Sequence, residues 1–209
     1  MSREYNTVVG EKENLIEIQR SKFICNVKGV ENEAEAKAFV ESIRKKHSLA
    51  NHNCYAYIAD DKGLIQKFSD DGEPQGTAGL PMLEVLKAKK VYKTVAVVTR
   101  YFGGIKLGTG GLTRAYGGSV SDCLAMANVV TMQDAEIYQI VTDYEGYSIL
   151  LKLVASKDVV VMDTDFSDKI TVKVAVKSDF SCKFHDNVID SFNGKISINV
   201  LDKMFFPFK

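Results

Sequence analysis

The stretch Ser69–Gly118, SDDGEPQGTAGLPMLEVLKAKKVYKTVAVVTRYFGGIKLGTGGLTRAYGG, decides the fold of this 209-residue chain. It holds ten of the fifteen glycines and two of the three prolines. A glycine inside a helix or strand costs about 0.5–1 kcal/mol relative to alanine, so ordinary packing does not account for this density. The stretch therefore specifies particular backbone conformations or the close approach of another group.

Hydrophobic periodicity predicts eight elements in the first 130 residues, in the order ββαββαβα. The continuous β-branched run Thr94–Thr99 is typical of a strand that is buried on both faces. Pro81 suits the first position of a helix. The other predicted strands are 15–18, 22–27, 54–59 and 64–69, and the other predicted helices are 33–47 and 110 or 111 to 127.

After Asn128 the glycines nearly vanish and clean alternation predicts a βαββαβ order, which is that of a ferredoxin-like module. We therefore predict an α+β protein with two domains, residues 1–130 and 131–209. The predicted strands of the second domain are 135–141, 159–166, 169–177 and 196–200, and its predicted helices are 144–155 and about 180–192.

Composition indicates an ordinary folded protein, with 45% hydrophobic and 26% charged residues. Residues before Val130 include 18 Lys and Arg against 15 Asp and Glu, and the remainder include 9 against 12, so the halves carry about +3 and −3. This asymmetry is too small for an avid or sequence-specific DNA binder, and any nucleic-acid role must depend on a local patch. No apolar run approaches the roughly 20 residues of a membrane span, and no signal peptide is evident, so we expect no membrane association and a cytoplasmic location.

The four cysteines, Cys25, Cys54, Cys123 and Cys182, form no Cys-x-x-Cys pair. We therefore expect reduced, mostly buried thiols, with neither a metal site nor a cofactor. His52 and Cys54 would share one face of a strand, but no third group is present to orient a nucleophilic pair. We favour a structural role for both.

The loop Gly103–Arg114 lies between a predicted buried strand and a predicted helix, which is the context of a phosphate-binding loop. Lys106 and Arg114 would add positive charge. The spacing nevertheless fails the P-loop motif, because Thr109-Gly110 stands in place of Lys-Ser/Thr, and the third Rossmann glycine is also missing. Binding of an anion or an RNA backbone, and close packing against the turn 72–79, both remain open.

Asp70, Asp71 and Glu73 could form a metal or acid–base cluster. Neighbouring carboxylates in a turn more often stabilise that turn or pair with a cation such as Arg100, and we favour this interpretation. A mixture of cations and aromatics, as on many RNA-facing surfaces, comprises Arg100, Tyr101, Phe102, Lys106, Arg114 and Tyr116, with Tyr55 and Tyr57 nearby. Burial of the aromatics in the core is the alternative.

Four segments, FSDDGEPQGTAGLPML, VVTRYFGGIKLGTGGLTRAYGG, RSKFI and HNCYAY, together resemble the IMPACT family, and the full length resembles its bacterial, two-domain YigZ-type members. The resemblance implies a fold like domain 2 of ribosomal protein S5 for the first domain. It also implies that the second, ferredoxin-like domain is similar to the last domain of a translocase elongation factor.

Eukaryotic members of that family regulate translation by competing with a starvation-activated kinase for its activator, with the help of an additional N-terminal domain that we do not expect in this chain. For bacterial members the resemblance implies association with RNA or the ribosome and no catalytic residues. The family motif positions form the expected functional surface, namely Asp70, Asp71, Gly72, Glu73, Pro74, Gly76, Arg100, Gly103, Gly104, Gly108, Gly110 and Gly111.

Our leading hypothesis is a non-enzymatic, translation-associated protein that binds RNA or the ribosome. The expected phosphate-binding residues are Arg100, Gly103, Gly104, Lys106, Gly108, Thr109, Gly110, Gly111 and Arg114. One alternative is a phosphate- or nucleotide-handling enzyme that uses the same loop. Another is a scaffold that docks a protein partner in translation control.

Overall fold

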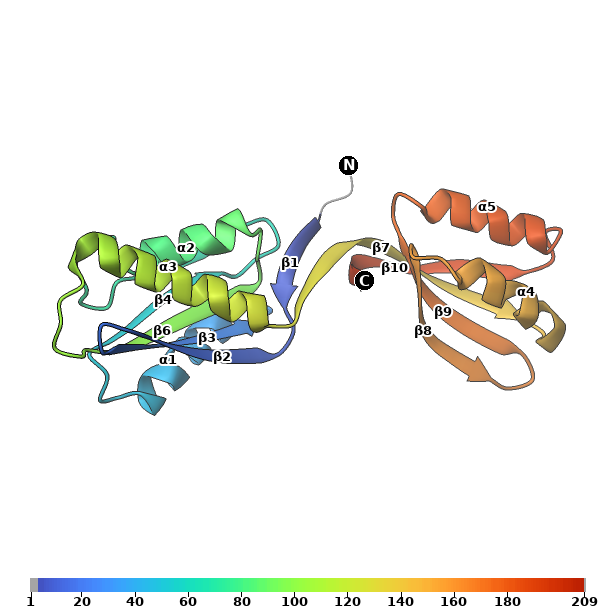
Figure 1. Ribbon diagram of the computed structural model, residues 1–209. Helices are drawn as coiled ribbons and strands as arrows, with labels where there is room; N and C mark the ends of the chain where they lie inside the picture. The colour runs from blue at the N-terminus through green and yellow to red at the C-terminus, as the bar shows by residue number, and fades with distance from the viewer. Residues whose placement is uncertain (1–3, 209) are drawn as a thin grey trace. The chain divides into compact units, whose positions relative to one another are not determined.

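The structure, a computed structural model, describes residues 4–208, which form a mixed α/β fold with five helices (Figure 1). The chain divides into two compact units, one from Tyr5 to Val130 and the other from Thr131 onward. A bilayer-crossing helix would need a long apolar segment, and none of the helices within residues 4–208 provides one.

The first unit is built on a five-stranded antiparallel sheet with the order β2-β3-β6-β4-β5. The strands of this sheet are β2 (Glu11–Ile18), β3 (Ser21–Gly29), β4 (His52–Ile58), β5 (Gln66–Ser69) and β6 (Thr94–Tyr101). A short strand, β1 (Glu4–Val8), precedes them and is not part of this sheet. Its helices are α1 (Glu33–Lys46), α2 (Gly79–Ala88) and α3 (Gly108–Met126).

Helices cover both faces of this sheet, with α2 and α3 on one side and α1 on the other (Figure 1). The central strand β6 is buried from Thr94 to Arg100, and its side chains alternate between the two layers. Val98 packs with Met82 and Leu112, whereas Val97 packs with residues of α1. The prediction of a strand buried on both faces is confirmed.

Several predicted boundaries were wrong. Strand β1 was missed because its pentapeptide EYNTV has no clear alternation, and tertiary bonds hold it, such as the one from Tyr92 N to Asn6 O (2.8 Å). Helix α2 starts at Gly79, two residues before Pro81, and α3 starts at Gly108. Strand β5 starts only at Gln66, where its pairing with β4 begins opposite Ile58.

The second unit has the succession βαββαβ and an antiparallel sheet in which β10, β7, β9 and β8 are neighbours in that order. Leu150 of one helix and Phe184 of the other share a core with Ile140 and Val174 of the sheet. The elements are β7 (Val129–Thr142), α4 (Tyr144–Val154), β8 (Val159–Phe166), β9 (Ile170–Lys177), α5 (Ser181–Ser191) and β10 (Ser197–Phe208).

Strand β10 continues eight residues beyond the predicted end at Val200. The predicted strand ends at Val200 because the apolar alternation of the sequence is lost there. The structure has a register shift between Val200 and Asp202 at this point. Pairing with β7 then resumes as far as Phe208.

The packing of α2 makes a direct prediction. Leu86→Ala should lower the free energy of unfolding by about 2–5 kcal/mol, because Leu86 is fully buried and its removal leaves a cavity. Leu80→Ala on the same helix is the matched control, and it should cost less than about 1 kcal/mol because Leu80 is 40% exposed. Urea unfolding followed by circular dichroism measures both, and equal losses would contradict this account of the core.

Candidate functional site

Three connecting segments meet at one end of the first sheet. In the strand register Lys22 pairs with Tyr101 and His52 pairs with Arg100, while Tyr55 pairs with Ser69. The β2–β3 turn, the segment between β5 and α2, and the loop between β6 and α3 therefore lie together. All three contain sequence motifs on which the family resemblance depends.

Close packing accounts for one glycine of the loop. A Cβ atom on Gly103 would lie 2.1 Å from the carbonyl carbon of Arg20, and Gly103 N donates a hydrogen bond to Ser21 Oγ (3.1 Å). The packing alternative placed this glycine against the turn 72–79. The structure places Gly103 against the β2–β3 turn instead. Gly79 has a separate reason, since its Cβ would lie 2.7 Å from the backbone of Ser69.

The remainder of the loop is open to solvent. Lys106, Gly108, Thr109 and Gly110 are exposed. Leu107 is in the right-handed helical region and Gly108 follows it with φ +69°, a succession that turns consecutive backbone N–H groups toward one concavity. Helix α3 then begins with no side-chain cap and no acidic residue in its first turn.

Two cations stand beside this uncapped helix start. A Cβ atom on Gly110 would lie 3.8 Å from Arg114 Nη1, so the guanidinium extends back over the first turn of α3. Lys106 belongs to the loop itself. Neither Lys106 nor Arg114 has a carboxylate partner among residues 4–208. Backbone donors and unpaired positive charge therefore converge there.

Asp70 is a structural residue. Its Oδ1 accepts hydrogen bonds from the backbone N–H groups of Ala78 (3.0 Å) and Gly79 (2.8 Å), and its Oδ2 accepts one from Gly76 (2.8 Å). Asp70 thus caps α2 from eight residues upstream, and this explains why the helix starts before Pro81. Its carboxylate oxygens are occupied by backbone donors.

Asp71 is also occupied. It accepts hydrogen bonds from Asn53 N (2.7 Å) and Arg44 Nη2 (3.0 Å), and its φ is +42°. The interpretation of this acidic pair as turn-stabilising residues and ion-pair partners is confirmed by these contacts. A metal or acid–base role for the pair has no geometric support.

Glu73 and Arg100 form a buried ion pair, with Glu73 Oε1 at 2.7 Å from Arg100 Nη1. Tyr116 of α3 donates a second hydrogen bond to the same oxygen (2.7 Å). The rings of Phe23 and Phe102 each lie 5.4 Å from the guanidinium. Glu73 and Arg100 are 8% and 5% exposed, so neither is on the outer surface that the motif positions were expected to form.

A cavity of about 390 Å³ separates this ion pair from the start of α3. Lys106, Gly108 and Thr109 line it on the helix side. The remaining lining residues are Glu73, Pro74, Arg100, Phe102, Leu107 and Leu112. The sequence did not identify Leu107 and Leu112 as lining residues of this cavity, because an apolar residue near a helix start is equally typical of the core.

The structure corrects the expected aromatic surface. Tyr57 and Tyr116 are buried, and Tyr101 is half-buried with its hydroxyl 3.0 Å from His47 Nδ1. His47 is therefore part of a tertiary contact. Phe102 is 44% exposed and lies next to the cavity. Phe102 is thus the aromatic that a ligand at the loop could meet.

Cys54 is not an activated nucleophile. It is fully buried, its thiol donates to Asp70 O (3.0 Å), and burial raises the pKa of Cys54 to about 12. His52 Nδ1 lies 2.9 Å from Asp71 O. Both side chains have the structural role that the sequence favoured.

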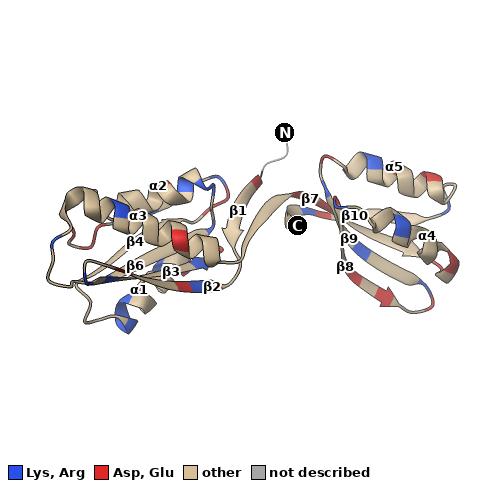
Figure 2. Cartoon of the chain, in the orientation of Figure 1, with Lys and Arg blue, Asp and Glu red and all other residues tan. Residues whose placement is uncertain are grey.

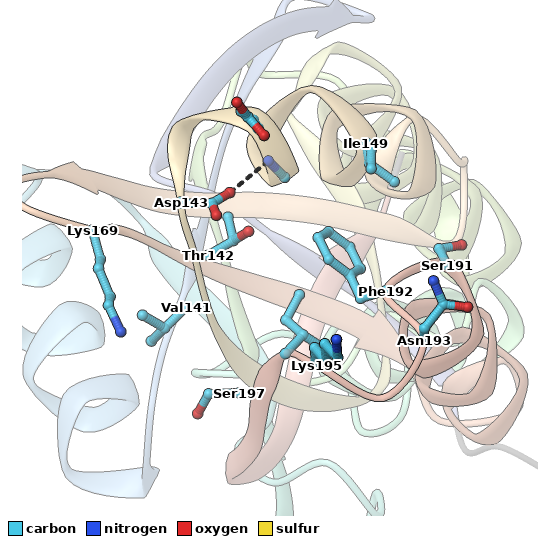
Figure 3. Close-up of a pocket in the computed structure, with 13 residues that line it drawn as sticks. Val141, Thr142, Asp143, Ile149, Lys169, Ser191, Phe192, Asn193, Lys195 and Ser197 are labelled. Atoms are coloured by element: carbon cyan, nitrogen blue, oxygen red, sulfur yellow. Dashed lines mark hydrogen bonds between the residues drawn. The ribbon is translucent and has the colours of Figure 1, made fainter.

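A second hollow, of about 520 Å³, lies in the second unit between the start of α4 and the turn before β10 (Figure 3). Asp143 lines it and accepts a hydrogen bond from Gly146 N (2.8 Å). Within residues 4–208, no buried side-chain atom that lacks a hydrogen-bond partner belongs to its lining. The cavity in the first unit differs, because Arg100 Nε is such an atom.

Charged residues are distributed over both units, and each unit has both basic and acidic residues (Figure 2). A ligand that recognises charge must therefore recognise a local arrangement. The start of α3 with Lys106 and Arg114 is such an arrangement.

Burial predicts which thiols react. Cys25, Cys54 and Cys123 are buried and Cys182 is exposed. At about pH 8 the native protein should therefore react at one thiol with a disulfide reagent, whereas the urea-unfolded protein should react at all four. The control is Cys182→Ser, which should leave no fast-reacting thiol. Rapid modification of Cys54 in the native protein would contradict the description of this end of the sheet.

The capping role of Asp70 predicts a loss of stability. Asp70→Ala should lower the free energy of unfolding by at least about 2 kcal/mol, because three backbone donors lose their charged acceptor. Asp70→Asn should cost less, since one carbonyl oxygen remains. Glu84→Ala on the surface of α2 is the control, with an expected change within about 0.5 kcal/mol. Equal stability of Asp70→Ala and the control in urea titrations would refute the capping role.

Comparison with known proteins adds an independent observation. A family model described as the Impact N-terminal domain matches residues 19–124, which include all residues of the site. "IMPACT family member YvyE" of Bacillus subtilis (strain 168) is 41% identical over 198 residues, covering 95% of this chain and 91% of that protein. "IMPACT family member YigZ" of Escherichia coli (strain K12) is 35% identical over 190 residues, covering 90% of this chain and 93% of that protein.

A solved structure also matches. It is described as "Crystal structure of an hypothetical protein" and is 32% identical, with a TM-score of 0.61. The match covers 97% of this chain and 99% of that one. The similarity therefore extends over both units of the chain.

Proposed function

This chain belongs to the IMPACT family, and from that premise we propose that it is a translation-associated protein that binds RNA, free or on the ribosome, through the start of α3. The observation that carries the proposal is the convergence of three features at one point. These are the uncapped N-terminus of α3, the unpaired cations Lys106 and Arg114, and the exposed path of the loop.

The physical basis is attraction of phosphate. A helix start carries a partial positive charge of about half an elementary charge, and its free N–H groups can donate to phosphate oxygens. Helix α3 has 19 residues and no acidic side chain in its first turn to compete for these donors. Lys106 and Arg114 add two positive charges beside them. An RNA phosphate would therefore meet backbone donors and cations together.

Exposed apolar side chains favour RNA over an isolated inorganic anion. Phe102 and Ile105 are 44% and 41% exposed on the same loop. Proteins that bind single-stranded nucleic acid combine cations along the backbone with aromatic rings on which bases stack. The exposed Arg20, whose backbone carbonyl packs on Gly103, supplies a further cation nearby.

The finer fold assignments are also part of the proposal. We assign the first unit to the S5-domain-2-like fold on the family resemblance. For the second unit we propose a ferredoxin-like fold related to the last domain of a translocase elongation factor. The βαββαβ succession and the neighbour order β10, β7, β9, β8 support this second assignment.

The enzymatic alternative has weaker support. It requires Asp70 or Asp71 for Mg²⁺ binding or proton transfer, and both carboxylates are committed to backbone and arginine partners. A scaffold for a protein partner predicts a stable complex that forms without RNA. No contact in the first unit favours that scaffold over RNA binding.

The proposal predicts a specific loss of RNA affinity. Lys106→Ala/Arg114→Ala should weaken binding of a short single-stranded RNA, and the slope of log affinity against log salt should fall by about 1–1.5, because two phosphate contacts are lost. Fluorescence anisotropy over a range of salt concentrations measures both quantities. Circular dichroism should show an unchanged fold, since both side chains are exposed.

The matched control is Lys62→Ala/Lys89→Ala, which removes the same charge from exposed positions. Ile58 pairs with Thr94, so these residues lie near the opposite end of β6 from the loop. The control should bind RNA like the unmodified protein. Equal affinity of both double variants would overturn the proposed function.

A further inference from the structure

We propose that the cavity between Glu73 and the start of α3 accepts one ribonucleotide unit, and that Glu73 distinguishes ribose from deoxyribose. The proposal deepens the RNA-binding function and rests on it. The RNA-binding function concerns phosphate and charge, whereas this inference concerns the sugar. Its evidence comes from the floor of the cavity.

Glu73 presents an unused acceptor to the cavity. Its Oε1 accepts hydrogen bonds from Arg100 and Tyr116, each at 2.7 Å, and His52 Nε2 lies 3.8 Å from the same oxygen. Its Oε2 has no hydrogen-bond partner in the described part of the chain. An ionised carboxylate only accepts hydrogen bonds, and Oε2 is not among the buried unpartnered side-chain atoms of the described residues, so it remains accessible as an acceptor. The floor is therefore complementary to a hydroxyl or N–H group.

The ion pair removes electrostatic conflict with a phosphate. The charge of Glu73 is balanced by Arg100, so the floor does not repel an anion bound at the helix start. Arg100 Nε is buried and without a partner, although Arg100 lines the cavity. The floor thus presents the Glu73 acceptor beside a guanidinium that balances its charge.

The cavity has three chemically distinct regions that match the parts of a nucleotide. Lys106, Gly108 and Thr109 at the helix start suit the phosphate. Apolar side chains, including the partly exposed Phe102, suit the base. Glu73 suits a sugar hydroxyl. The volume of about 390 Å³ falls in the range of small-molecule sites, roughly 300–1,000 Å³.

Within a nucleic-acid chain this arrangement selects RNA. The 3′ and 5′ oxygens of an internal nucleotide are esterified, so the 2′-hydroxyl is the one sugar group that can donate, and DNA lacks it. A free ribonucleotide offers the same chemistry from a different source. The experiment must therefore compare sugars within oligomers and compare oligomers with mononucleotide.

The test uses the full chain and three labelled oligomers of identical uracil sequence, made with ribose, deoxyribose and 2′-O-methylribose. The ribose oligomer should bind about 10-fold more tightly than the other two, because only its 2′-hydroxyl donates to Glu73. Lys106→Ala should weaken all three oligomers by the same factor and leave the ratio unchanged. Loss of the ratio in Lys106→Ala would contradict the division between phosphate and sugar contacts.

Glu73→Gln tests the direction of the hydrogen bond. The amide oxygen can still accept from Arg100 and Tyr116, and the amide nitrogen replaces Oε2 as a donor. The amide N–H can donate to a 2′-hydroxyl oxygen or to a 2′-O-methyl ether oxygen equally well. The preference for ribose over 2′-O-methylribose should therefore narrow to about 2-fold. Thr109→Trp, at an exposed lining position, should fill the cavity and abolish the preference for ribose. This variant tests the cavity even if Glu73→Gln does not fold.

The possible failures are distinguishable. Equal affinity of the unmodified protein for ribose and deoxyribose oligomers, with the Lys106/Arg114 dependence intact, would overturn this inference and leave RNA binding standing. If neither the oligomers nor uridine monophosphate bind, both the ribose preference and the RNA-binding function are overturned. If uridine monophosphate competes as strongly as an equal concentration of the ribose oligomer, the cavity accepts a free ribonucleotide.

Discussion

The buried ion pair between Glu73 and Arg100 is the contact on which the rest of the site depends. Arg100 is on β6 and Glu73 is on the segment before α2, while Tyr116 joins them from α3. Removing two charges from water is costly, and removing one partner of such a pair leaves an uncompensated charge in the interior. The pair therefore holds three segments of the chain in a fixed relation. The cavity exists because these segments meet around charges that must stay together.

Local periodicity predicted most of the regular structure, and it failed where tertiary contacts decide. The run Thr94–Thr99 and the alternation of Ile170–Lys177 carry enough pattern to specify strands. Strand β1 has too little pattern, because its stability comes from bonds to residues near position 91. The start of α2 depends on Asp70, whose capping bonds span up to nine residues, a longer interval than a local N-cap motif.

The candidate site was predictable in part for the same reason. Glycines around a helix start, with Arg114 four residues after Gly110, are local signals, and they predicted that Lys106 and Arg114 lie close to the start of α3. Pairing of the turn carboxylates with a cation such as Arg100 was favoured from the sequence, and Glu73 makes this pair. Its burial was not predictable, because the two residues are 27 positions apart and lie together only through the juxtaposition of β6 and the turn before α2. The sequence left Tyr116 open between the core and an RNA-facing surface, and the structure places it in the core.

The contact between Gly103 and the carbonyl group of Arg20 separates what can vary in this loop from what cannot. A side chain at position 103 would displace the β2–β3 turn, and Gly104 and Gly108 have φ of +87° and +69°, so glycine fixes the path of the loop at these points. Ile105 and Lys106, which lie between these points, are exposed and meet no such restriction. Substitutions at these two positions can therefore change which ligands the loop prefers without altering its backbone path.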